Sequence, residues 1–288
     1  MKGRTILRWL FQLKFIWLYI YIVFLLQDCE AYHIGKSRPS ASQFEKASLP
    51  KHIGFILDGN ARWARDRMLP VKVGHIKGAE RAISTLRLCG NLDIPYVTMY
   101  IFSTENMQRN KEEIGHIMSI ILDTIASFRE EAERENIRIR ILGDLLNSGF
   151  PRDVCHSLRD LESDSTRWSS SDRDTSQLTV CLAINYGSRQ DILKACKSII
   201  QSTPESNISE DTLKQHLGTA DLPDPDLIIR TGGERRLSNF LLWEAAYSEL
   251  YFCDEMWPDF DEECFRRALD NYKQRDRRFG TRKELSPA

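Results

Sequence analysis

The sequence lacks the features that mark several common classes of protein. Its 40 lysines and arginines are balanced by 41 aspartates and glutamates, so it has no global basic excess and no nucleic-acid partner is expected. Its seven cysteines are dispersed without a CxxC pair, which argues against a disulfide framework and a structural zinc site. Neither GxGxxG nor Walker A occurs, which disfavours binding of dinucleotides or of nucleotides in a P-loop. Any polyanion must therefore bind at a local basic cluster.

The N-terminus carries the main apolar run. Lys2, Arg4 and Arg8 precede an uninterrupted stretch from Phe15 to Leu26 that is shorter than a comfortable membrane span. Residues 1–31 are therefore predicted to be a hydrophobic signal or membrane-anchor segment, and residues 32–50 a basic, serine-rich linker. We expect location at the endoplasmic reticulum membrane or, if the signal is cleaved, in a plastid or other organelle.

The remainder alternates between strand-like and helix-like segments. Apolar runs predict strands at 53–57, 96–102, 178–184, 227–229 and 250–252, and alternation predicts another at 137–142. Helical spacing predicts helices at 78–90, 111–136, 189–201, 209–217 and 240–248 and partly over 145–161, with a loop over 163–177. This order predicts an α/β fold with a mainly parallel sheet flanked by helices. The apolar stripe of helix 111–136 either faces the core or lines an apolar tunnel.

A first cluster of chemically useful residues, DGNARWARDRMLPVKVGH, runs from Asp58 to His75. A carboxylate ends the first strand, arginines follow at once, and Pro70 to His75 are expected to form a loop. This combination suits a metal-bound phosphate or diphosphate over a helix N-terminus, although a solvated surface helix would show similar arginines.

A second cluster, RTGGERRLSN, runs from Arg230 to Asn239. Its arginines can grip phosphate oxygens, and its two glycines predict a tight turn whose N–H groups point inward. Glu249 follows, either as a structural partner for an arginine or as a second magnesium ligand beside Asp58, since magnesium accepts one or two carboxylates plus substrate phosphates. Two cationic clusters and an apolar stripe predict a diphosphate substrate with an apolar tail.

The segments HIGFILDGNARWA, GHIKGAE, FSTEN, DLIIRTGGERRLSNFLLWEAAYSELYF and WPDF together resemble the cis-prenyltransferase family. The resemblance runs from about His52 to Gly280, within a predicted catalytic domain at 51–280 and before a tail at 281–288. It implies a single domain with a six-stranded, mainly parallel sheet and an apolar tunnel. It further implies successive condensation of isopentenyl diphosphate onto an allylic diphosphate such as farnesyl diphosphate, with Mg²⁺ as cofactor, for dolichol or polyprenol synthesis.

The resemblance also assigns roles to individual residues. The catalytic set is Asp58, Asn60 and His75, and the metal ligands are Asp58 and Glu249. The allylic diphosphate would bind at Gly59, Arg62, Trp63 and Lys72. Isopentenyl diphosphate would bind at Phe102, Ser103, Glu105, Asn106, Arg109, Arg230, Arg236 and Ser238. Arg278 and Gly280 belong to a C-terminal pattern that reaches a partner's active site, so a homodimer or a heteromer with a related subunit is expected.

Four positions depart from the family's pattern, and one of them is Met107, which stands where an aromatic residue is common. Val71 stands where an arginine is common, with Lys72 beside it as a substitute, and Arg235 replaces a histidine. Ile101 replaces a small residue and would shorten the product if it points into the tunnel. The alternatives to a self-sufficient long-chain enzyme are a catalytic subunit that needs a non-catalytic partner, a short-chain synthase and a membrane-anchored lipid-phosphate binder without catalysis. A non-catalytic subunit of a heteromer is disfavoured, because such partners typically lose the aspartate and the RTGGE-type motif that this chain retains.

Overall fold

The central feature of the chain is a six-stranded sheet in which every pairing is parallel, in the order β3-β4-β2-β1-β5-β6. The computed structural model describes residues 49–145, 150–169, 178–202 and 208–275, which fall in one compact unit. The strands are β1 His52–Ile56, β2 Tyr96–Ser103, β3 Arg138–Leu142, β4 Thr179–Tyr186, β5 Leu227–Arg230 and β6 Glu249–Phe252. All six strands predicted from the sequence are confirmed within two residues.

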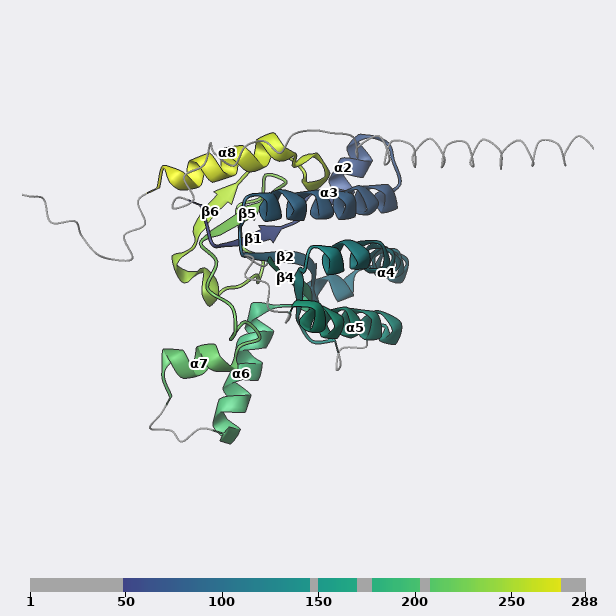
Figure 1. The fold of residues 1–288 in the computed structure, drawn as a ribbon. Helices are drawn as coiled ribbons and strands as arrows, with labels where there is room; N and C mark the ends of the chain where they lie inside the picture. The colour runs from purple at the N-terminus through teal and green to yellow at the C-terminus, as the bar shows by residue number, and fades with distance from the viewer. Residues whose placement is uncertain (1–48, 146–149, 170–177, 203–207, 276–288) are drawn as a thin grey trace, which may run out of the picture. The chain divides into compact units, whose positions relative to one another are not determined.

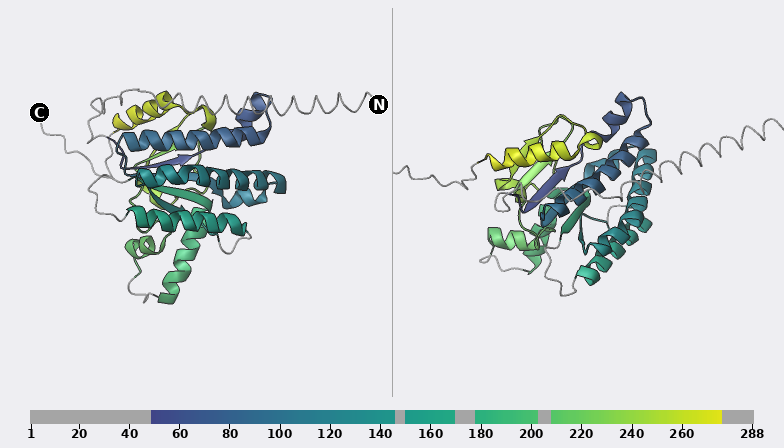
Figure 2. Two further views of the ribbon diagram at one scale, coloured as in Figure 1. Left: turned by 45° about the vertical axis from the view of Figure 1, so that its right-hand side comes forward. Right: turned by 45° about the horizontal axis from the view of Figure 1, so that its top comes forward.

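The central strands are covered on both faces, which explains their continuous apolar runs. Every residue of β1 and β5 is buried. Helices α3 Val71–Asn91, α4 Lys111–Arg134, α5 Arg152–Ser169 and α8 Glu262–Lys273 contribute to the larger core on one face. The smaller core on the other face includes Leu222, Phe240 and Leu241. Figures 1 and 2 show α3, α4 and α5 side by side, with α6 Ser188–Ser202 and α7 Glu210–His216 away from them.

Helix α3 begins earlier than its apolar spacing predicts. The sequence favoured a loop from Pro70 to His75 followed by a helix from Gly78, but the helix starts at Val71. Pro70 occupies its N-cap with φ −58°, and proline near a helix start costs no intrahelical hydrogen bond. The prediction was wrong because it read proline only as a loop residue, and the correction places Lys72 and His75 on a rigid helix.

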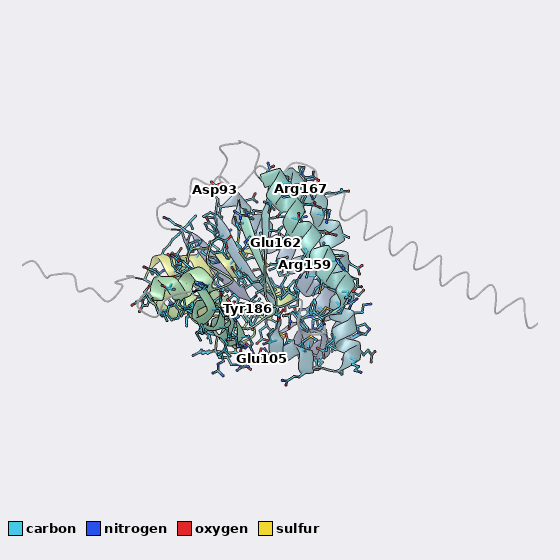
Figure 3. The ribbon with its side chains drawn as sticks, turned by 90° about the horizontal axis from the view of Figure 1, so that it is seen from below. Asp93, Glu105, Arg159, Glu162, Arg167 and Tyr186 are labelled. Atoms are coloured by element: carbon cyan, nitrogen blue, oxygen red, sulfur yellow. The ribbon has the colours of Figure 1, made fainter. Side chains whose placement is uncertain are left out.

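Helix α5 extends into the stretch predicted as a loop. The polar composition after Ser163 suggested an exposed loop, but α5 continues to Ser169 because its polar side chains bond to the edge strand β3. Ser165 accepts a hydrogen bond from the backbone of Ile139, and Glu162 accepts one from the backbone of Ile141. Figure 3 labels Glu162 on this helix. These contacts cover strand donors that would otherwise lie unpaired at the sheet edge.

The segment after Ser238 is a third place where the structure differs from the predicted helices. The predicted helix 240–248 is reduced to a 3-10 turn, η6 Glu244–Tyr247. Ser238, Asn239 and Leu241 all have positive φ, between 43° and 66°, which a helix cannot include. The chain therefore folds back over the sheet instead of leaving it.

The predicted N-terminal segment, the linker up to residue 48, Arg278, Gly280 and the C-terminal tail lie outside the described residues. Within the part of the chain that is described, no helix combines the length and the hydropathy needed to cross a bilayer.

Candidate functional site

The site forms at two neighbouring parallel strands whose following segments cover opposite faces of the sheet. Strands β1 and β5 are hydrogen-bonded partners, with Ile56 opposite Arg230. After β1 the chain enters α2 Asn60–Asp66 and α3 on the face of the larger core, whereas after β5 it crosses the face of the smaller core. Open α/β sheets bind ligands in the crevice at such a switch point. Asp58 and Arg230 lie at this crevice.

Both oxygens of the Asp58 carboxylate bind arginines. Oδ1 accepts a hydrogen bond from Arg62 at 3.1 Å, and Oδ2 accepts one from Arg230 at 2.8 Å. Arg230 is only 4% exposed, and its other terminal nitrogen donates to Ser238 Oγ at 2.8 Å and to the Arg236 carbonyl. The two sequence clusters, 172 residues apart, therefore meet in one charged network.

The backbone of Asp58 is held by residues that the sequence analysis did not single out. Thr231 Oγ1 donates to the Asp58 carbonyl at 2.7 Å and accepts from the Asp58 N–H at 3.1 Å. The Trp257 N–H also donates to that carbonyl, at 2.9 Å. The only signals in the sequence were the threonine within RTGG and the tryptophan of WPDF, to which no role had been given. Three backbone contacts fix the carboxylate against the crevice.

Asn60 is positioned by two glycines of α3. A Cβ atom at Gly74 would lie 2.1 Å from the Asn60 carbonyl oxygen, and one at Gly78 would lie 2.3 Å from Asn60 Oδ1. The Trp257 indole donates to the Gly78 carbonyl at 2.8 Å and holds this part of α3 in place. Glycine is needed at both positions because the start of α2 lies directly against α3.

Gly78→Ala is expected to lower kcat/KM by roughly a hundredfold, the scale associated with an ångström of misplacement near the reacting groups. The matched control is Gly115→Ala on α4, where an added Cβ would meet nothing within 4 Å. That control is expected to keep its activity and to gain about 0.5–1 kcal/mol of stability, because alanine is the better helix former. Steady-state kinetics and thermal unfolding of both variants test this. Equal activity of the two would contradict the role given to Gly78.

The two glycines after Arg230 do not act as predicted. Their φ values of 81° and 78° confirm the tight turn, but their N–H groups are already used. Gly232 donates to the Glu255 carbonyl at 2.7 Å, and Gly233 donates to the Cys253 carbonyl at 2.9 Å. The expected pair of inward-pointing N–H groups is therefore wrong. Gly232 instead allows close approach, since a Cβ there would lie 2.7 Å from the Arg62 guanidinium.

An apolar cavity of about 390 Å³ opens from this charged crevice. Its polar lining includes Asp58, Asn60, Arg62, His75, Ser103, Asn106, Arg109, Arg230 and Ser238. Its apolar lining includes Phe102 and part of the α4 stripe, namely Ile117, Ile121, Ile125 and Phe128. Both readings of that stripe hold, because these four side chains are buried in the core and also line the cavity. A charged opening joined to an apolar interior suits a molecule with a charged head and an apolar tail.

His75 lies on the cavity wall and is partly buried. Burial lowers the pKa of His75 below its usual value, and the nearby charge of Arg109 lowers it further. Its Nδ1 atom is buried and has no hydrogen-bond partner among the described residues. Arg109 itself bonds Glu113 at 2.9 Å. In a neutral imidazole one ring nitrogen donates a hydrogen bond and the other accepts one. His75 can therefore donate or accept a hydrogen bond at this wall.

Three other predicted binding residues do not line the cavity. Trp63 donates to Asp259 at 2.7 Å and carries the Arg67 guanidinium over its ring. Arg236 is exposed and pairs with Glu234, and Lys72 is exposed on the first turn of α3. Trp63 lies on α2, Lys72 lies on α3 and Arg236 lies in the segment after β5. None of the three side chains is part of the cavity wall in this structure.

Glu105 lies at the same edge of the sheet and outside the lining. It follows β2, whose last residue pairs with Tyr186 at the end of β4, and Figure 3 labels both Glu105 and Tyr186. Partial burial alone would raise the pKa of Glu105, but hydrogen bonds, including one from Asn239 at 2.9 Å, outweigh it and lower the pKa. The carboxylate therefore ties the FSTEN segment to the RTGGERRLSN cluster.

Glu249 is not brought to Asp58 within one chain. It begins β6 and pairs with Leu227, at the amino edge of the sheet, whereas Asp58 follows the carboxyl end of β1. Three residues of strand at about 3.3 Å each already separate the two edges by roughly 10 Å. Its carboxylate instead binds Arg275 at 2.6 Å. Glu249 therefore does not share a magnesium site with Asp58 in this structure, and the alternative interpretation, a structural partner for an arginine, describes Glu249 here.

Three of the four departures from the family's pattern, Ile101, Val71 and Arg235, have different surroundings. Ile101 lines the cavity, so its side chain reduces the apolar space. Val71 is the first residue of α3, and Lys72 beside it is exposed. Arg235 is exposed and makes no ion pair with any described residue.

Comparison with known proteins agrees with this geometry. A model of the family described as "Putative undecaprenyl diphosphate synthase" matches residues 56–280. The isoprenyl transferases of Agrobacterium fabrum and Aquifex aeolicus are 42% and 44% identical to this chain. Those matches cover 82% and 81% of this chain and 94% and 96% of the two relatives.

Two solved structures share the fold. Lavandulyl diphosphate synthase from Lavandula x intermedia, in complex with dimethylallyl diphosphate, has a TM-score of 0.74 and 32% identity, over 82% of this chain and 100% of that one. A "probable undecaprenyl diphosphate synthase" from Campylobacter jejuni has a TM-score of 0.65 and 31% identity, over 81% and 99%.

The fold and the site thus define an isoprenyl transferase of the α/β type, with a charged crevice above an apolar cavity. The chain belongs to the undecaprenyl diphosphate synthase family of cis-prenyltransferases.

Proposed function

We propose that this protein condenses isopentenyl diphosphate units onto an allylic diphosphate such as farnesyl diphosphate and releases a polyprenyl diphosphate. One observation carries the proposal: the Asp58–Arg230 network lies at the mouth of the apolar cavity. The charged crevice suits the diphosphates, and the cavity suits the growing hydrocarbon chain. The likeness to a synthase whose structure contains dimethylallyl diphosphate supports an allylic substrate.

The residues of the crevice divide the work of binding and orientation. Arg62, which lines the cavity at the start of α2, favours the allylic diphosphate. Arg230 and Ser238 hold the diphosphate of isopentenyl diphosphate so that its double bond faces the allylic carbon. As the allylic C–O bond breaks and the new C–C bond forms, Arg62 stabilises the departing diphosphate. The proton lost from the condensed unit passes to Asp58 or to a diphosphate oxygen.

The site fits a magnesium ion whose ligands come partly from the protein and partly from the substrates. No group of three His, Cys, Asp or Glu that could hold a metal occurs among the described residues, and Asp58 is the one carboxylate in the cavity lining. Magnesium is commonly held by one or two carboxylates together with substrate phosphates, and Asp58 with the diphosphates supplies that set. When bound, the ion would neutralise diphosphate charge and assist its departure.

As the cellular role we propose synthesis of a long polyprenyl diphosphate for dolichol or polyprenol. The proposed location is the endoplasmic reticulum membrane, to which residues 1–31 would attach the protein. A second candidate is a short-chain synthase, which the bulk of Ile101 in the cavity wall favours. A third is a catalytic subunit that works only as a heteromer with a related, non-catalytic chain.

Incubation of the purified protein with labelled isopentenyl diphosphate, farnesyl diphosphate and Mg²⁺ tests the proposal. Product from the protein alone supports a catalytic homomer, and product only after a partner is added supports the heteromer. Binding of both diphosphates without product would contradict enzymatic function and leave a lipid-phosphate binder. Sizing the product by mass spectrometry separates a long-chain from a short-chain synthase.

Ile101→Ala is expected to lengthen the main product by at least about one isoprene unit, because it removes three methyl or methylene groups from the cavity wall. The control is Val97→Ala on the same strand, which removes buried apolar volume outside the lining. Product sizes are compared by mass spectrometry at equal substrate ratios. An unchanged product from Ile101→Ala, or equal lengthening by both variants, would contradict a role for Ile101 in product length.

A further inference from the structure

The turn between α2 and α3 presents apolar side chains to solvent. Met68 is 94% exposed, and Leu69 and Ile76 are 40% and 38% exposed. We call residues 65–77 the α2–α3 tip. None of these three side chains packs in either core, and none lines the cavity. Folding and the proposed reaction therefore do not account for them.

The backbone of the tip is fixed, so the exposed side chains are a built feature. The N–H groups of Arg67 and Leu69 both donate to the Ala64 carbonyl, at 3.1 and 2.8 Å, and the Met68 N–H donates to Arg65 at 3.0 Å. Met68 has φ +55°, a left-handed conformation that favours glycine. Met68 thus holds a large apolar side chain outward at a position where glycine would be less strained.

The exposed apolar group is surrounded by positive charge. The tip contains four basic residues, Arg65, Arg67, Lys72 and Lys77, and one acidic residue, Asp66. Arg67 pairs with Asp259 and Lys77 pairs with Glu80, whereas Arg65 and Lys72 make no ion pair among the described residues. Exposed apolar side chains ringed by lysine and arginine are typical of surfaces that lie in the interface of an anionic bilayer.

We propose that the α2–α3 tip docks on an anionic membrane surface, with Met68 and Leu69 at the boundary between headgroups and acyl chains. The charge of the tip selects this occupant, because an acidic lipid surface complements Arg65 and Lys72, unpaired among the described residues, and offers an apolar layer to Met68. The same two helices supply Asn60, Arg62 and His75 to the cavity lining. Docking at the tip therefore holds the cavity close to the bilayer. The contact is separate from the predicted N-terminal segment and does not depend on the proposed reaction.

Photocrosslinking of the full-length chain tests the proposal. A benzophenone amino acid replaces Met68, and the protein is irradiated with vesicles of phosphatidylcholine alone or mixed with phosphatidylserine. The control carries the same probe at Glu133, which is exposed near the end of α4 at the opposite edge of the sheet. Because every protein retains residues 1–31, membrane attachment through that segment is common to all.

A lipid adduct at position 68 that is several-fold stronger with phosphatidylserine, and that falls at high salt, is the expected result. The same probe combined with Arg65→Glu and Lys72→Glu should lose that preference for anionic vesicles. The proposal is overturned by equal lipid labelling at positions 68 and 133, by labelling that ignores lipid charge, or by an adduct with protein in place of lipid.

Discussion

Asp58→Asn is expected to reduce kcat by about a thousandfold, the scale found when a preorganised electrostatic group is removed from a reaction centre. Asparagine keeps the shape of the side chain and can still accept one hydrogen bond, but it removes the negative charge that Arg62 and Arg230 both contact. The loss of stability should be smaller, about 1–3 kcal/mol, because Asp58 is partly exposed and Arg230 keeps its contacts to Ser238 and Arg236.

The matched control is Asp270→Asn on α8, whose exposed carboxylate makes a long contact with Lys273, at 3.7 Å. It should change neither turnover nor stability measurably. Single-turnover assays with farnesyl and isopentenyl diphosphates measure the chemical step, and thermal unfolding shows whether each variant is folded. A folded Asp58→Asn variant with turnover near that of the parent would remove Asp58 from the reaction.

Arg230→Lys is the second substitution with a large expected effect. Lysine keeps the positive charge but cannot contact Asp58 on one side and Ser238 Oγ on the other, as the guanidinium does at 2.8 Å each. We expect the KM for isopentenyl diphosphate to rise about a hundredfold, equivalent to roughly 2.7 kcal/mol at 1.36 kcal/mol per tenfold change. The KM for farnesyl diphosphate should rise much less, because Arg62 and the start of α2 serve that substrate in the proposed arrangement.

Arg266→Lys is the control for this substitution, since Arg266 contacts Glu262 and Glu263 on the exposed face of α8. Its effect on both KM values should be small, as is usual for exposed ion pairs. Initial rates measured with each substrate varied in turn give the two KM values. Equal increases in both for Arg230→Lys would contradict the division of the crevice into two diphosphate sites.

The positions that the sequence misassigned share one physical cause. Apolar spacing reports which residues are buried, but it does not report where a buried or polar group finds its partner. The polar residues of α5 looked like a loop because their partners, the N–H groups of β3, lie on another element. The N–H groups of Gly232 and Gly233 looked available because the Glu255 and Cys253 carbonyls that accept from them come later in the chain. Pro70 was interpreted as a loop residue because proline interrupts the interior of a helix. The structure shows that it lies at the N-cap of α3, where it is tolerated.

The sequence by itself determined the six strands, their parallel arrangement and the two cationic clusters, because strand periodicity and the order of elements are local properties of the chain. Only the tertiary structure decided which charges meet. Strand pairing brought Arg230 to Asp58 across 172 residues, and the same pairing placed Glu249 at the opposite edge, against Arg275. The reason is that strand pairing joins segments far apart in the sequence, so the partner of each charged side chain depends on contacts that no single segment contains.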